Sequence, residues 1–224
     1  MRRVPMSGWY SNTGNDPCGP VAPVTPLAPV LQQDSSVQAM VLAAGVGRRL
    51  RPLTDRIPKA LVEVAGVSQL ERTLTALETA GAQRIVVNIH HHAQQIESVL
   101  AGRRSASEIL VSREETTPLE TGGGLVHARE LFRDGLPILV HNVDIITSVD
   151  LKELYEGHDS SRCLATLAVQ ERPTSRYLMF DDAGLQGRLD VHDGRRVDTR
   201  PIRGPVRRFA FSGIHVVSGS VFDL

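Results

Sequence analysis

Residues 36–224 are predicted to form a three-layer α/β domain with a mostly parallel sheet and an antiparallel β extension, on three observations. Short apolar runs alternate with stretches whose apolar residues recur at helical spacing through the first half of the chain. Glycine-rich or polar loops follow the apolar runs, as at the carboxyl ends of buried parallel strands. From Cys163 onward, short β-type runs joined by charged, glycine-containing turns replace this alternation.

The first strand is expected at residues 37–44, an apolar run that ends at Gly45, and a loop rich in glycine, arginine and proline follows at 45–58. Residues 68–80 carry apolar side chains at helical spacing and stop at Gly81, so a helix is expected there. Further strands are expected at 84–89, 108–112 and 136–141, and further helices at 93–100, 123–132 and from 150 onward. The later β-type runs cover 163–169, 177–180, 185–191, 208–211 and 213–217. Alternating strands and helices predict right-handed crossovers, with helices on both faces of the sheet.

The composition is that of an ordinary globular chain, with 41% hydrophobic and 22% charged residues among 224. The 25 basic and 25 acidic side chains balance, which argues against a protein that coats nucleic acid. No run of 18 apolar residues is present, so no membrane-spanning helix is expected. Cys18 and Cys163 are too few for a disulfide framework or a zinc cluster, and no apolar stretch follows the basic start, so a cytoplasmic location is expected.

Residues 1–35 differ in kind from the rest of the chain. They hold six of the 13 prolines, and between Pro17 and Pro29 a proline recurs about every third residue. Because proline lacks a backbone donor and fixes φ, an extended, polyproline-like disordered tail is predicted. A docking segment for a proline-reading module is the alternative.

The loop after the first strand combines glycines with a dense group of positive charges. Gly45 and Gly47 allow close backbone approach, so neighbouring N–H groups can converge on an anion. Five basic side chains follow within twelve residues, namely Arg48, Arg49, Arg51, Arg56 and Lys59. A polyanion such as a nucleoside triphosphate explains this density, and a surface loop decorated with arginine is the alternative. The dinucleotide and Walker patterns both fail, because Leu50 stands at the third glycine position and no G-K-[ST] occurs.

The run LAAGVGRRLRPLT from Leu42 to Thr54, followed by Pro58 and Lys59, resembles the opening motif of the sugar-1-phosphate nucleotidyltransferases. The resemblance covers residues 38–224 in order, and it implies the Rossmann-like fold of the nucleotide-diphospho-sugar transferases. It implies that Arg49 clamps the triphosphate and that Lys59, one of only two lysines, neutralises the reacting phosphates. The residues implied to hold the nucleotide here are Leu42, Ala43, Ala44, Gly45 and Gly47.

A second glycine cluster, LETGGG at residues 119–124, is expected to open a helix. Taken alone, it is as readily a flexible turn. Members of the family that act on N-acetylmuramate 1-phosphate carry a similar string, which implies that Gly122 and Gly123 hold the nucleoside, with Glu120 and Thr121 as weaker candidates. UTP is therefore the expected triphosphate, and GTP, as in mannose-1-phosphate-type members, is the alternative.

Asp144 lies just past the strand expected at 136–141, at the sheet edge where α/β proteins bind ligands. A turn or capping role is the alternative for an isolated aspartate. The resemblance implies that Asp144 binds Mg²⁺, which takes few carboxylates together with phosphate oxygens and water. Asp150 is expected to cap the next helix instead. Because the family has a second metal-binding aspartate on a later strand, we expect the chain to be truncated at its C-terminus.

For the sugar phosphate, the resemblance implies Ser212 and Gly213 on a late strand, with Arg176 and Glu171 as further pocket candidates. A solvated ion pair is at least as good an interpretation of Arg176 and Glu171. The E-K-P triplet that contacts the sugar in many members is absent, so the identity of the sugar is left open.

Two other patterns are interpreted structurally. His90, His91 and His92 cannot all bind one ion from an extended segment, because neighbouring side chains alternate, so a polar loop is expected. The basic stretch at 195–208 contains an aspartate and no interleaved aromatic residue, which favours a solvated turn over nucleic-acid contact.

The expected activity is transfer of a nucleotidyl group from UTP or GTP to a sugar 1-phosphate, with release of pyrophosphate and Mg²⁺ as the cofactor. No nucleic-acid or membrane partner is expected. Two alternatives are open: a non-catalytic module that binds a nucleotide or a sugar phosphate, and an inert fragment that lacks the second metal carboxylate.

Overall fold

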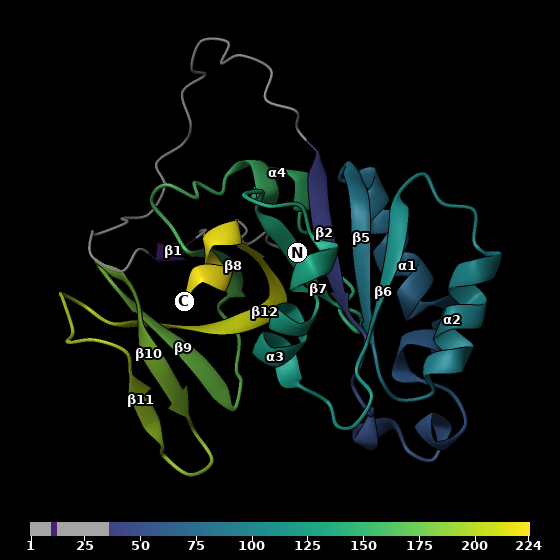
Figure 1. Ribbon diagram of the computed structural model, residues 1–224. Helices are drawn as coiled ribbons and strands as arrows, with labels where there is room; N and C mark the ends of the chain where they lie inside the picture. The colour runs from purple at the N-terminus through teal and green to yellow at the C-terminus, as the bar shows by residue number, and fades with distance from the viewer. Residues whose placement is uncertain (1–9, 13–35) are drawn as a thin grey trace, which may run out of the picture.

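The computed structural model describes residues 10–12 and 36–224. Within this part of the chain, a large mixed sheet forms the centre of the fold (Figure 1). Its main path has the strand order β11-β10-β9-β12-β7-β2-β5-β6, while β8 pairs with β12 and with β1. The strands of this sheet are β1 Tyr10–Asn12, β2 Val37–Leu42, β5 Ala82–Ile89, β6 Glu108–Arg113, β7 Ile138–Asn142, β8 Ala165–Gln170, β9 Arg176–Asp181, β10 Gly184–Asp190, β11 Arg196–Asp198 and β12 Arg207–Val217.

The parallel half of the sheet confirms the predicted fold class. β2 lies between β7 and β5, β6 forms the far edge, and the three pairings are parallel. Met40 of β2 stands opposite Val86 of β5 and Val140 of β7, and all three side chains are buried. Burial on both faces explains why these strands are continuous apolar runs and do not alternate with polar residues.

Helices cover both faces of this half, which makes three layers. They are α1 Gln69–Thr79, α2 Ala93–Gly102, α3 Glu120–His127 and α4 Leu151–Glu156. Ala39 and Val41 of β2 pack in one core with apolar side chains of α1, α2 and α4. Met40 packs in the opposite core with Leu125 of α3. Successive strand residues thus enter alternate layers, as the period of a strand requires.

Local signals place both ends of α1 and the start of α4 where the sequence predicts them. Ser68 Oγ accepts a hydrogen bond from the Glu71 N–H at 3.2 Å and caps α1. Gly81 follows α1 with a φ of +90°, in the left-handed region that glycine enters without a steric cost. Asp150 Oδ1 accepts from the Glu153 N–H at 2.9 Å, which confirms its predicted role as the cap of α4.

The helix expected at 123–132 begins three residues earlier than predicted. α3 spans Glu120–His127, and a separate 3-10 turn at Arg129–Leu131 (η4) follows it. The glycine cluster therefore lies inside the first turns of α3 and does not precede the helix. This shift changes which residues of the cluster face the cavity described below.

Short structures that the sequence did not predict occupy the expected loop at 45–58 and its continuation. Three 3-10 turns and a small hairpin lead from β2 into α1. They are η1 Arg48–Leu50, η2 Leu53–Asp55, η3 Lys59–Leu61, β3 Glu63–Val64 and β4 Val67–Ser68.

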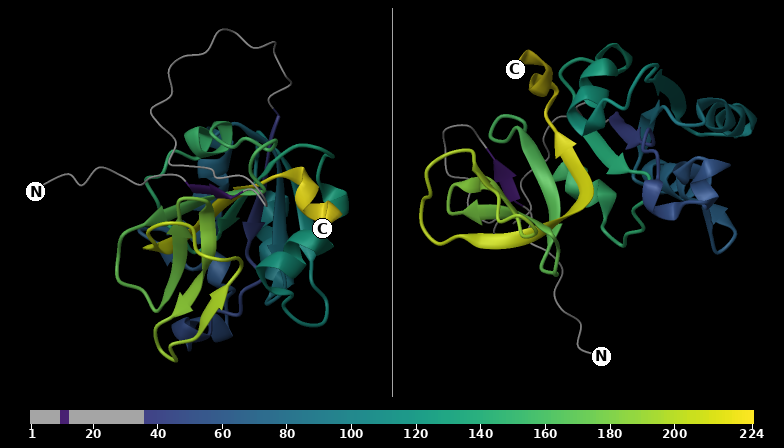
Figure 2. Two further views of the ribbon diagram at one scale, coloured as in Figure 1. Left: turned by 90° about the vertical axis from the view of Figure 1, so that its left-hand side faces the viewer. Right: turned by 90° about the horizontal axis from the view of Figure 1, so that it is seen from below.

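The antiparallel extension depends on β12, an 11-residue strand. It was predicted as two runs but is one strand, because Gly213, with a φ of +77°, permits a bulge that bends the strand without ending it. The end of β12 pairs with β7 and its beginning pairs with β9, so β12 joins the parallel half to β9, β10 and β11 (Figures 1 and 2). β11 falls within the stretch predicted as a solvated turn, and its side chains are exposed.

Of the tail predicted at residues 1–35, residues 10–12 belong to the described part, where they form β1 along β8. The prediction for the remainder concerns residues outside the described part. No helix within 36–224 has the length and hydropathy that crossing a bilayer requires.

Candidate active site

A cavity of about 430 Å³ opens at the carboxyl ends of β2, β5 and β7, where open α/β sheets bind ligands. Leu42 of β2 lies at its base, in register with Asn88 of β5 on one side and Asn142 of β7 on the other. The loop after β2, the segment between β6 and α3, and the start of α3 complete the wall. The lining residues are Leu42, Ala44, Gly45, Val46, Gly47, Arg48, Asn88, Glu114, Pro118, Glu120, Thr121, Asn142 and Asp144.

The loop after β2 folds around the buried side chain of Thr54. Thr54 Oγ1 donates a hydrogen bond to the Gly47 carbonyl at 2.9 Å, and His91 Nε2 lies 3.2 Å from the Thr54 carbonyl oxygen. Gly47 has a φ of +67°, and a Cβ at this position would stand 2.8 Å from Thr54 Cγ2. Both constraints require glycine, so Thr54 and Gly47 together fix the path of the loop along the cavity.

Four of the five residues predicted to hold the nucleotide in this loop line the cavity. They are Leu42, Ala44, Gly45 and Gly47. Ala43 points instead into the core beneath, and its N–H donates to the Asn88 carbonyl at 2.9 Å. Alternation along the end of β2 accounts for the difference between Ala43 and its neighbours.

The two adjacent arginines of η1 lie differently. Both side chains are exposed, but only Arg48, which the motif places in a variable slot, lines the cavity. In a 3-10 turn successive side chains point about 120° apart, so both cannot face the same ligand from one turn. The assignment of Arg49 to the triphosphate stays a prediction.

Lys59 and Asp144 are brought together as the sequence analysis expects. Lys59 Nζ forms an ion pair with Asp144 Oδ2, and Asp144 lines the cavity. The side chains are 28% and 38% exposed respectively, so both remain accessible to a ligand. An ammonium group and a carboxylate group therefore meet at the edge of the cavity.

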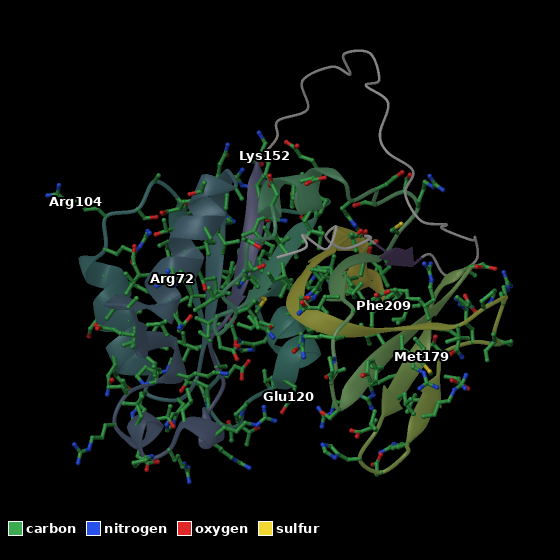
Figure 3. The ribbon with its side chains drawn as sticks, turned by 180° about the vertical axis from the view of Figure 1, so that it is seen from behind. Arg72, Arg104, Glu120, Lys152, Met179 and Phe209 are labelled. Carbon is green, nitrogen blue, oxygen red and sulfur yellow. The ribbon has the colours of Figure 1, made fainter. Side chains whose placement is uncertain are left out.

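At the start of α3, Glu120 and Thr121 line the cavity, while Gly122 and Gly123 do not. Figure 3 shows Glu120 at the end of α3 that faces the space between the parallel half and the antiparallel extension. A Cβ on Gly123 would stand 2.9 Å from Leu119 Cβ, so this glycine allows the helix to pack against the chain before it. The weaker candidates of the sequence analysis thus face the cavity, because α3 begins earlier than predicted.

Three lining residues with amide or carboxylate side chains were missed from the sequence: Asn88, Glu114 and Asn142. Asn88 is 1% exposed and Glu114 is 3% exposed, which is unusual for polar side chains at a cavity. The sequence feature that could have indicated Asn88 and Asn142 is a polar residue inside or at the end of an apolar strand. It occurs in VVNI for Asn88 and in HNVD for Asn142. Nothing in the sequence indicates that Asn88 would meet Glu114.

The predicted sugar-site residues on β12 lie beside the cavity. A Cβ on Gly213 would stand 2.9 Å from Ile145 Cγ1 and 3.0 Å from Nδ2 of Asn142, a lining residue. The bulge at Ser212 and Gly213 therefore packs against the segment that follows β7. A side chain at position 213 would displace that segment, which explains the need for glycine.

Arg176 and Glu171 do not line this cavity. Arg176 Nε lies 3.2 Å from Asp190 Oδ2 across the β9–β10 pair, and its side chain is 73% exposed. Glu171 is exposed just after β8. For Arg176 the structure matches the alternative of a solvated ion pair, although its partner is Asp190 and not Glu171.

The donor set around Asp144 fits a hard divalent cation such as Mg²⁺. Asp144 offers an accessible carboxylate, and the amide of Asn142 lies on the same wall. Mg²⁺ commonly takes one or two protein carboxylates and completes its shell with phosphate oxygens and water. Within residues 10–12 and 36–224 no three His, Cys, Asp or Glu side chains are grouped to hold a metal, so a cation here would depend on the triphosphate.

The histidines near the cavity have structural partners. His90 Nδ1 lies 2.8 Å from the Glu114 carbonyl oxygen, and His91 bonds to Thr54 as described above. His141 on β7 lies 2.8 Å from the Asn142 carbonyl oxygen, and burial lowers the pKa of its imidazole. The contacts of His90 and His91 agree with the expectation of a polar loop, whereas Nε2 of His92 is buried with no hydrogen-bond partner in the described part of the chain.

Residues 38–184 match the family model described as nucleotidyl transferase. N-acetylmuramate alpha-1-phosphate uridylyltransferase of Neisseria meningitidis is 40% identical over 84% of this chain and 78% of its own length. The Caulobacter vibrioides protein of the same name is 47% identical over 48% of this chain and 46% of its own length. Mannose-1-phosphate guanylyltransferase 1 of Arabidopsis thaliana is 35% identical over 59% of this chain and 38% of its own length.

The matched region thus spans less than half of the Caulobacter and Arabidopsis relatives. Among solved structures, the inositol-1-phosphate CTP transferase of T. maritima superposes with a TM-score of 0.61 at 17% identity, covering 85% of this chain and 74% of that one. At this identity the likeness concerns the fold, and it agrees with the three-layer arrangement described above.

Proposed function

Because this chain belongs to the nucleotidyl transferase family, we propose that it transfers a nucleotidyl group from a nucleoside triphosphate to a sugar 1-phosphate. A phosphate oxygen of the sugar phosphate attacks the α-phosphorus in line. A new P–O bond forms, and the bond to the bridging oxygen breaks as pyrophosphate leaves. The attacking oxygen is already anionic, so the reaction needs no strong general base. The protein must instead supply alignment and neutralisation of charge.

The observation that carries the proposal is the meeting of Lys59 and Asp144 at the edge of a cavity lined by Gly45 and Gly47. The ammonium group of Lys59 would neutralise the reacting phosphates, and the carboxylate of Asp144 would hold a divalent cation, Mg²⁺ by its donor chemistry. When bound, that ion supplies charge neutralisation and polarises the phosphate oxygens. Backbone N–H groups of the glycine loop would approach the phosphate chain.

The remaining roles follow the positions of the residues along the cavity. Arg49 is assigned to the β- and γ-phosphates by the motif, and Arg48 reaches the cavity from the same turn. Glu120 and Thr121 would lie beside the nucleoside at the other end of the cavity. The bulge at Ser212 and Gly213 would face the sugar phosphate.

We propose UTP as the triphosphate and GTP as the alternative. The LETGGG string favours a uridylyl group, and the Neisseria and Caulobacter relatives are named for uridylyl transfer to N-acetylmuramate 1-phosphate. The Arabidopsis relative is named for guanylyl transfer to mannose 1-phosphate. A cytoplasmic location belongs to the proposal, because two cysteines provide no disulfide framework.

The direct test is release of pyrophosphate by the 224-residue chain. UTP, GTP, CTP and ATP would each be combined with N-acetylmuramate 1-phosphate, mannose 1-phosphate or glucose 1-phosphate in the presence of Mg²⁺. We expect release that requires both substrates, and a nucleotide-sugar product in equal amount by mass spectrometry. Binding of a triphosphate without release from any pair would instead support the non-catalytic module, which the family and the named relatives do not favour.

A further inference from the structure

The carboxylate of Glu114 joins two elements of the cavity wall. Its Oε1 accepts a hydrogen bond from Asn88 Nδ2 at 2.7 Å, at the end of β5. Its Oε2 accepts from the Leu119 N–H at 2.7 Å, at the start of α3. Glu114 is 3% exposed and lines the cavity together with Asn88. Both oxygens of a buried carboxylate are therefore used to hold α3 against the parallel sheet.

The same contact decides which way the amide of Asn88 faces. A carboxylate can only accept hydrogen bonds, so the amide must turn its NH₂ group toward Glu114 and its Oδ1 away from it. Within the described part of the chain, no protein donor bonds to that oxygen. Because Asn88 belongs to the cavity lining, Oδ1 is an acceptor available to a ligand there.

Helix α3 packs directly against this pair at Gly124. A Cβ on Gly124 would stand 2.9 Å from Glu114 Oε1 and 3.1 Å from Asn88 Nδ2. The third glycine of the cluster thus allows the helix backbone to rest directly on the hydrogen bond. Glu120 and Thr121, one turn earlier on α3, line the cavity beside it.

We propose that Glu114 is a positioning residue for the nucleobase, and that the orientation it imposes on Asn88 selects bases with a protonated ring nitrogen. Uracil has N3–H and guanine has N1–H, and each can donate to Oδ1. The corresponding nitrogens of cytosine and adenine are acceptors and would face Oδ1 without a proton between them. This inference rests on the proposed function, because it takes the ligand to be a nucleoside triphosphate.

Substitutions that exchange the donor and acceptor roles test the proposal. In Glu114→Gln, the N–H of Leu119 donates to the oxygen of the new amide, so the new NH₂ group faces Asn88. The Asn88 amide must then turn over and present NH₂ to the cavity. In the double variant Asn88→Asp, Glu114→Gln, the aspartate accepts from the glutamine and again presents an oxygen. Glu115→Gln is the matched control, because Glu115 is 74% exposed and pairs with Arg113.

The measurement is calorimetric binding of UTP, GTP, CTP and ATP to the full chain. We expect the better of UTP and GTP to bind at least about tenfold more tightly than CTP and ATP, as one hydrogen bond in a buried site allows. Glu114→Gln should lower that ratio by about tenfold or more, and the double variant and Glu115→Gln should keep it.

A Glu114→Gln chain that weakens all four nucleotides equally would overturn the proposal, because the role would then be structural only. Should that variant fail to fold, as judged by circular dichroism, the double variant decides, and a double variant that binds CTP as tightly as UTP would also overturn it. Loss of pyrophosphate release in a chain that keeps the base preference would count against the proposed reaction alone.

Discussion

The ammonium group of Lys59 contacts the carboxylate of Asp144, although the two residues lie 85 positions apart in the chain. Lys59 begins η3 after the loop that follows β2, and Asp144 lies two residues past the end of β7. β2 and β7 are adjacent and parallel, so their carboxyl ends share one edge of the sheet. Chain topology alone thus brings together the two charges that the proposed reaction needs.

Removing either charge should abolish most of the activity. We expect Lys59→Met and Asp144→Asn each to lower kcat/KM for pyrophosphate release by about 10²-fold or more, because each removes a group aimed at charge in the transition state. The two side chains are 28% and 38% exposed, so the melting temperature should change little. Lys152→Met is the matched control, since Lys152 pairs with Glu156 at 3.7 Å on α4 and lies at the opposite end of the molecule from Glu120 (Figure 3). Equal activity of Lys59→Met and Lys152→Met would refute the assignment.

Substitutions of the two adjacent arginines of η1 should have different effects on the steady-state kinetics. We expect Arg49→Ala to lower kcat/KM by about 10²-fold through loss of charge at the leaving group, and Arg48→Ala to raise the KM for the triphosphate by about tenfold. Arg51→Ala provides the control, because Arg51 is 57% exposed and pairs with Asp55 at 3.1 Å. Steady-state kinetics with varied triphosphate concentration measure these effects. If Arg49→Ala lowered kcat/KM no more than Arg51→Ala, the contact with the triphosphate would be assigned to Arg48 in place of Arg49.

The glycine loop shows what a motif can and cannot predict. The motif marked Gly45, Gly47, Lys59 and Asp144, and the structure brings these four residues to the same edge of the sheet. The position of Arg48 inside the cavity and of Arg49 outside it could not be predicted, because it depends on the 3-10 turn at Arg48–Leu50. A turn of three residues leaves no periodicity in the sequence to read.

The pairing of Asn88 with Glu114 escaped the sequence analysis for a different reason. Glu114 is a charged residue just past a short strand, which ordinarily indicates a solvated loop. It is buried only because two donors from β5 and the start of α3 converge on it. Such convergence is a property of the packed layers, so composition and spacing do not reveal it.

A side chain at position 47 should destabilise the loop. Gly47→Ala would place a Cβ 2.8 Å from Thr54 Cγ2 and force alanine to a φ of +67°, at a cost of about 1–3 kcal/mol in free energy of unfolding. Gly102→Ala is a suitable control, because a Cβ there meets nothing within 4 Å. Urea denaturation of both variants tests the difference. A Gly47→Ala chain as stable as Gly102→Ala would show that Thr54 does not restrain the loop.

Acid stability should depend on His215, a buried residue of β12. His215 is 8% exposed, its Nδ1 has no hydrogen-bond partner in the described part of the chain, and it stands opposite Val140 of β7. Burial lowers the pKa of its imidazole from 6.5 to about 4. Between these two pH values, the unfolded chain therefore binds a proton at His215 more readily than the folded chain does. The contribution of the neutral His215 to the free energy of unfolding is thus complete above pH 6.5 and is lost as the pH falls toward 4.

Replacing His215 by a group that does not titrate should flatten the acid side of the stability profile. A pKa difference of this size corresponds to a loss of about 3 kcal/mol in the free energy of unfolding of the wild-type chain between pH 7 and pH 4. The His215→Gln chain should avoid most of this loss. Urea denaturation at pH 7, 5.5 and 4.5 measures the slope, and the exposed His192, replaced in the same way, should leave it unchanged. Ion pairing with Arg200 also lowers the pKa of Asp181, so some acid sensitivity should persist in both variants. If His215→Gln lost stability as steeply as the wild type, the neutral buried imidazole would not be the group that makes the fold acid-sensitive.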